Sequence, residues 1–182
     1  MKKRAVKNRG RPLSKPGEPS VTAEHLAAAI QAAVLMNLKE KETVCDVLYA
    51  TQPNLLASVL VLPSLGVAME TVDAVLNILI VLHLAVEKSG QALEMVTEQE
   101  QERQLRRFAA AVRFAQGLDA QSFAQSIRQT TAYSKENILL DYVIDALRRS
   151  GIADQPQENA KYPMMAAINL VNCIATAKRT GG

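Results

Sequence analysis

Apolar residues recur every three or four positions over most of residues 21–182, which is the spacing of helices that bury one face. Capping and turn residues divide this pattern into segments. We predict helices from Ser20 or Thr22 to about Lys39, over 41–51, 54–62, 70–88 and 98–116, after Asp119, from Ser134 to Gly151, and from Pro163 to about Arg179. The sequence therefore predicts an all-α fold, a single orthogonal or bundle-like domain of about seven or eight helices.

The secondary structure of residues 54–62 cannot be predicted from apolar spacing alone. Its apolar run fits either a buried strand or a short core helix. Its neighbours on both sides are helical and no second strand is evident to pair with it, so we predict a helix.

The segment 70–88 is apolar on nearly every side in its middle. Leaving Ile80 and Leu84 in water would forfeit about 1.5–3 kcal/mol for each side chain. Such a helix lies either at the centre of a bundle or in an oligomer interface. Ile80 and Leu84 are therefore candidate interface residues, and self-association is expected.

The first 20 residues differ from the rest in composition. They contain three prolines, two glycines and almost no large apolar residue, so they cannot bury enough surface to offset the entropy of ordering. We predict a disordered arm over residues 1–20 and a helical domain over 21–182. Against one acid, Glu18, the arm has seven basic side chains: Lys2, Lys3, Arg4, Lys7, Arg9, Arg11 and Lys15.

Within the arm, residues 8–13 read Asn-Arg-Gly-Arg-Pro-Leu. This resembles the AT-hook, a short DNA-binding motif centred on Arg-Gly-Arg-Pro, with Asn8 where the family usually has proline. The resemblance implies that Arg9 and Arg11 enter a narrow A/T-rich minor groove, where negative potential is concentrated. Gly10 would let the backbone approach the groove floor and Pro12 would keep it extended. Phosphates would be contacted by Lys2, Lys3, Arg4, Lys7 and Lys15.

The resemblance covers about a dozen residues, and other interpretations of the arm remain open. It could be a solubilising or targeting tail of a helical protein-interaction module, such as an adaptor, effector or assembly subunit. It could also bind RNA or an anionic membrane surface. A helix-turn-helix within 119–149 is a weaker alternative, because its second helix has too narrow a polar face to enter a groove.

Catalytic chemistry finds little support in the sequence. His25 and His83 have no metal-ligand spacing, and Cys45 and Cys173 have no evident base partner. We expect no enzyme activity, metal or cofactor. With few cysteines, no signal peptide and no uninterrupted apolar run of the length that spans a bilayer, we expect a cytoplasmic protein outside the membrane. The expected function is that of a DNA-associated regulatory or nucleoid-type protein whose body oligomerises or docks a protein partner.

Overall fold

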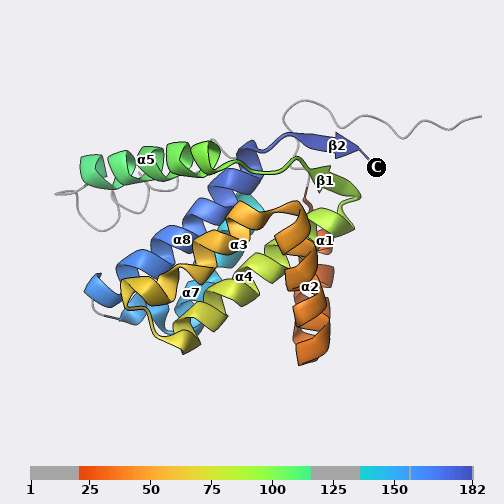
Figure 1. Cartoon of the computed structure of the whole chain (residues 1–182), viewed down its shortest axis with the longest axis horizontal. Coiled ribbons are helices and arrows are strands. Elements are labelled where there is room, and N and C mark those ends of the chain that lie inside the picture. Colours follow the sequence, from red (N-terminus) through yellow and green to blue (C-terminus); the bar gives the residue numbers. More distant parts are fainter. Residues whose placement is uncertain (1–20, 116–135, 156, 182) are drawn as a thin grey trace, which may run out of the picture.

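The computed structural model describes residues 21–115, 136–155 and 157–181, and their fold is almost entirely helical (Figure 1). The all-α prediction is confirmed: seven α-helices are described, together with two short 3₁₀ turns and one pair of short strands. In chain order the elements are α1 (Ala23–Leu35), α2 (Leu38–Thr51), α3 (Pro53–Leu60), η1 (Leu62–Leu65), α4 (Met69–Lys88), β1 (Gln91–Leu93), α5 (Glu98–Ala115), α7 (Asn137–Arg149), η2 (Ile152–Asp154), α8 (Gln157–Thr176) and β2 (Arg179–Gly181). The predicted helix after Asp119 and the cap at Ser134 lie outside the described residues.

Helix α4 lies at the centre of the bundle, with α1, α3, α7 and α8 packed around it (Figure 1). Eleven of its 20 residues are buried, on all sides of the helix. Ile80 and Leu84 are only 1% and 6% exposed within the single chain. The sequence left two positions open for these residues, the centre of the bundle or an oligomer interface, and the structure places them at the centre. They leave little surface for a second chain, so self-association stays a prediction that needs another surface.

The length and composition of α4 would also suit a membrane-spanning helix. Among the described residues it alone meets that test as a single helix, and α2 with the 53–65 segment meets it only as a pair bent by 119°. Of the most apolar window of α4, 56% is buried inside the chain, as in a core helix.

Two capping boxes define the first two helices. Thr22 is confirmed as the cap of α1: its Oγ1 accepts a hydrogen bond from the His25 amide at 3.3 Å, and His25 Nδ1 accepts one from the Thr22 amide at 3.2 Å. The predicted extension of this helix to Lys39 is wrong. Asn37 begins α2 by accepting from the Glu40 amide at 3.0 Å, while Glu40 accepts from the Asn37 amide at 2.8 Å. This reciprocal cap outweighed an apolar spacing that continues through the break.

Segment 54–62 is helical as predicted, since α3 spans Pro53–Leu60 with Pro53 in its first turn, where a missing amide hydrogen has no cost. The last helix was placed too late in the chain. It begins at Gln157, so Pro163 lies inside it, and it ends at Thr176.

One feature was not predicted: a small antiparallel sheet in which β1, between α4 and α5, pairs with β2, after α8. Residues Gln91, Ala92 and Leu93 of β1 pair with Gly181, Thr180 and Arg179 of β2. Three-residue strands have too little sequence pattern to be recognised. Their pairing joins segments almost 90 residues apart, and it brings the last described residues back beside the end of α4.

The burial of His83 on α4 predicts a dependence of stability on pH. Burial lowers the pKa of His83 below its ordinary value of 6.5, and the nearby charge of Glu87 opposes this only in part. The unfolded chain therefore takes up a proton near pH 6.5, whereas the folded chain does so only at lower pH. We expect the free energy of unfolding, measured by urea titration, to fall between pH 7.5 and pH 5.5.

His83→Gln should reduce this pH difference. The matched control is His25→Gln, which changes the other histidine but keeps a residue able to complete the capping box of α1. Equal effects of the two substitutions on the pH difference would show that burial of His83 is not its cause.

Candidate functional site: the attachment of the basic arm

The residues of the predicted DNA-binding arm lie outside the described residues. These are Lys2, Lys3, Arg4, Lys7, Arg9, Gly10, Arg11, Pro12 and Lys15. What the structure does describe is the point at which the arm joins the body. That point is Val21, whose side chain is fully buried.

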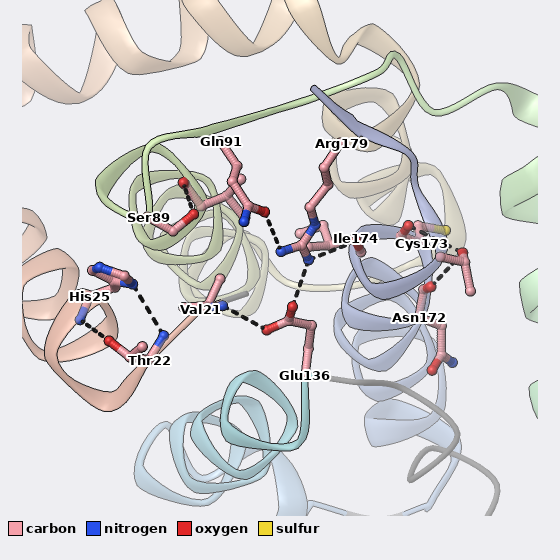
Figure 2. A network of polar contacts seen from close by, with 12 residues as sticks. Val21, Thr22, His25, Ser89, Gln91, Glu136, Asn172, Cys173, Ile174 and Arg179 are labelled. Atoms are coloured by element: carbon pink, nitrogen blue, oxygen red, sulfur yellow. Dashed lines mark hydrogen bonds and ion pairs between the residues drawn. The ribbon is translucent and has the colours of Figure 1, made fainter. Parts of the chain in front are cut away.

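A buried carboxylate holds this junction (Figure 2). Glu136, which is 1% exposed, lies just before α7, and its Oε2 accepts a hydrogen bond from the backbone amide of Val21 at 3.3 Å. The carboxylate is also close to the N-terminus of α7, where a negative charge is favourable. The first described residue of the chain is thus fastened to a residue 115 positions further on.

The other oxygen of Glu136 forms an ion pair. Glu136 Oε1 lies 2.9 Å from Nη2 of Arg179, and the two side chains are 2% and 14% exposed. Arg179 also donates to Gln91 Oε1 at 3.1 Å and to the Ile174 carbonyl at 3.2 Å. Figure 2 shows the guanidinium between Gln91, Ile174 and Glu136. One arginine therefore links α8, β1 and β2 to the start of α7.

Whether this cluster stabilises the fold depends on how fully its buried charges are compensated. Taking a carboxylate out of water costs several kcal/mol unless an opposite charge and hydrogen bonds compensate. Here both oxygens accept hydrogen bonds from the chain itself. The arrangement suits a clamp that fixes the position of Val21, and with it the point from which the arm leaves.

A second polar cluster holds the link between β1 and α5. Gln52 is 3% exposed; its Nε2 donates to the carbonyls of Leu93 and Glu94, both at 3.2 Å, and its Oε1 accepts from the Val96 amide at 2.9 Å. A glutamine at the end of α2 thereby fixes the path of 93–96.

Helix α5 is attached largely through amide and hydroxyl groups. Gln101 Nε2 donates to the Asn54 carbonyl at 3.0 Å, and Asn169 Nδ2 donates to the Gln101 carbonyl at 3.3 Å. Gln104, 4% exposed, donates to Thr176 Oγ1 at 3.2 Å. Of the apolar residues on this helix, Phe108 is buried and Leu105 partly buried, while the side chains of Val112 and Ala115 lie outside the described residues.

Arg103, Arg106 and Arg107 of α5 face solvent. Arg103 pairs with Glu100 and Arg106 pairs with Glu102, and the arginine side chains are 65% and 75% exposed. Pairing with glutamates of the same helix neutralises these arginines in part, which reduces their attraction for a phosphate backbone.

The histidines and cysteines are not brought together into a site. His25 serves the capping box of α1, and His83 lies within α4. Burial raises the pKa of the Cys45 thiol, and it raises the pKa of Cys173 to about 12. Both thiols therefore stay protonated at neutral pH, the less nucleophilic form. No group of three or more His, Cys, Asp or Glu side chains in the described part of the chain could hold a metal ion.

The Glu136–Arg179 pair should matter more for stability than an exposed pair. Arg179→Ala would remove the ion pair from a carboxylate that stays buried, and we expect the free energy of unfolding to fall by about 3–5 kcal/mol. Urea titration measures this loss. The matched control is Arg149→Ala, because Arg149 and Asp145 form a pair whose side chains are both 62% exposed.

The control should cost about 0–1 kcal/mol. The double variant Glu136→Gln with Arg179→Met should lose less than the sum of the two single variants, because it removes both charges. Similar small losses for Arg179→Ala and Arg149→Ala would contradict the role of the clamp.

Comparison with known proteins adds no family to this description. The chain matches no family model, no curated protein and no solved structure. The residues of the arm and of its attachment therefore carry the functional argument.

Proposed function

We propose that this chain is a DNA-associated regulatory or nucleoid-type protein, in which the basic arm binds the A/T-rich minor groove and the helical body oligomerises or docks a protein partner. We place it in the cytoplasm, without enzymatic activity or a cofactor. The arm supplies the location on DNA, and the body supplies the contact with other proteins.

The observation that carries this proposal is the distribution of charge around Arg9-Gly10-Arg11-Pro12. Seven of the 21 basic residues lie in the first 20 positions with a single acid, whereas residues 21–182 have 14 basic and 17 acidic residues. A polyanion is therefore attracted to the arm and weakly repelled by the body. Two arginines around a glycine are also the residue types that enter a narrow minor groove.

The attachment at Val21 supports this division of labour. Val21 is buried and its amide is held by Glu136, so the arm begins at a fixed point of the body. A chain of 20 residues spans at most about 70 Å when extended. The arm is thus long enough to follow a groove over several base pairs while the body stays off the DNA.

The arm predicts a specific response to deletion. Removing residues 2–19 keeps Ser20, so Val21 retains the peptide amide that Glu136 binds. We expect retention on A/T-rich DNA at about 0.1 M salt to be lost, because the cationic side chains that release counterions are gone. Unchanged retention, measured by fluorescence anisotropy, would refute the proposal.

Point variants separate groove binding from simple attraction. Arg9→Lys with Arg11→Lys keeps the charge, and we expect the preference for A/T-rich over G/C-rich duplexes to fall while overall binding changes little. The control, Lys2→Ala with Lys3→Ala, should weaken binding to both duplexes equally. It should also reduce the slope of log K against log salt concentration by about 1.8, or 0.9 for each phosphate contact. For a basic tail without groove preference, Arg9→Lys with Arg11→Lys would change binding to neither duplex, because the charge is kept.

A second candidate function is a helical protein-interaction module whose arm is a solubility or targeting tail. The observation that favours it is an apolar surface at the α3–η1 turn, where Leu60, Val61, Leu65 and Met69 are 57%, 48%, 45% and 61% exposed. Single exposed apolar residues are ordinary, whereas apolar residues that form one contiguous patch are typical of an interaction surface. Under this alternative, deleting the arm changes neither DNA retention nor the assembly of the body.

A further inference from the structure

Helix α5 lies at the edge of the bundle, and its main contacts are with α8 and α3 (Figure 1). Of its side chains over residues 98–110, only Gln104 and Phe108 are buried, and one of these two is polar. Helix α1 is also peripheral, but it packs on α4 through three buried apolar side chains, those of Leu26, Ala29 and Ala33. Little apolar burial therefore holds α5 in place.

The surfaces that meet between α5 and α8 are polar on both sides. Glu100 Oε1 accepts a hydrogen bond from Gln104 Nε2 at 2.6 Å and lies 3.2 Å from Thr176 Oγ1 of α8. Asn169 of α8 is only 7% exposed, yet its Oδ1 has no hydrogen-bond partner within the described residues. A buried oxygen without a partner is destabilising, and contact with water removes this cost. Opening this interface therefore exchanges hydrogen bonds within the chain for hydrogen bonds with water, and satisfies one more acceptor.

The chain immediately before α5 is fixed to the body. Val96 is 3% exposed; its amide donates to Gln52 Oε1 at 2.9 Å, and its carbonyl accepts from Asn54 Nδ2 at 2.8 Å. The next residue, Thr97, is exposed and belongs to the helix, because its Oγ1 accepts a hydrogen bond from the Glu100 amide at 3.2 Å. Hinges are commonly a few residues at the end of an element. The change from a fixed to an exposed residue places a hinge between Val96 and Thr97.

Cys173 of α8 lies close to the start of α5. It stands four residues after Asn169 and three before Thr176, so the three share one face of α8. Burial chiefly raises the pKa of its thiol to about 12, and the charge of Glu100 on α5 adds to this, as expected for a thiol near that carboxylate. The side chain is fully buried. Movement of α5 away from α8 would uncover the sulfur, so Cys173 reports whether α5 is docked.

We propose that α5 is a lid, which moves away from α8 about the hinge after Val96 while the rest of the bundle stays folded. Its opening exposes the α8 face of Asn169, Cys173 and Thr176. On the α5 side, opening exposes one large buried apolar side chain, Phe108. The open and closed states therefore differ little in free energy, which is what a regulated two-state element requires. This device goes beyond the proposed function, because it involves neither the arm nor DNA.

Amide hydrogen exchange of the full chain, followed by mass spectrometry, tests the lid. A helix of 18 residues without tertiary packing is marginal in water, so α5 should exchange its amides whenever it undocks. We expect peptides from residues 98–110 to be about 100-fold less protected than peptides from α1 and α4. Helix α1 is the matched comparison, because it is peripheral but has an apolar attachment. Equal protection of α5 and α1 would overturn the proposal.

Labelling of Cys173 with a maleimide reports the same motion. In a Cys45→Ser background Cys173 is the only thiol, since the chain has two cysteines. We expect Phe108→Ala to speed labelling by at least about tenfold, because it removes a buried apolar contact of α5. Asn169→Leu replaces the unpartnered oxygen with an apolar group of similar size and should slow labelling. The control Arg107→Ala changes an exposed residue of the same helix and should leave the rate unchanged. Equal rates in all three variants would overturn the proposal.

Urea separates opening of the lid from unfolding of the whole chain. Undocking of one helix exposes little surface, so the rate of Cys173 labelling should rise only weakly at low urea concentrations. Global unfolding exposes the whole core and has a correspondingly steep dependence on urea. A labelling rate that follows this steep dependence from the lowest urea concentration upward would show that α5 does not open by itself. That result would overturn the proposal even if the variants change the rate.

Discussion

The burial of α4 is the constraint on which the rest of the structure depends. Its middle turns are apolar on every side, and residues such as Val75, Leu79 and Leu82 are fully buried. A helix of this kind leaves water only when other helices surround it, each contributing one apolar face. This requirement places α1, α3, α7 and α8 around it and leaves their opposite faces outward (Figure 1).

The largely buried charged residues Glu136 and Arg179 hold separate elements of the bundle together. Glu136 and Arg179 lie at the ends of different elements, and their ion pair fastens the start of α7 to β2, while the other oxygen of Glu136 accepts from the Val21 amide (Figure 2). Such a pair contributes little net stability over an apolar equivalent, but losing one partner is costly. Its consequence here is positional: Val21 is held in place, so the basic arm and α1 begin from one defined point.

Sequence patterns predicted the helices better than their limits. Helices α3, α4 and α5 lie within a few residues of their predicted positions, because three- and four-residue apolar spacing is a local signal. The break at Asn37 was missed because apolar spacing continues through it, although the Asn37–Glu40 capping box is a local signal. The early start of α8 was missed because a proline inside a helix is tolerated only where the packing allows it. The sequence did not indicate the ion pair between Glu136 and Arg179, because ion pairs between residues far apart in the chain have no periodic pattern.

The sequence by itself determined the helical class of the fold and the concentration of positive charge in the first 20 residues, because helix formation and charge depend on residues close together in the chain. Only the tertiary structure decided which apolar residues are buried. It placed Ile80 and Leu84 in the core and left Val34 and Leu35 in solvent, although all four have similar side chains. The physical reason is that burial depends on which helices lie against each other, and that is settled by the packing of the whole chain.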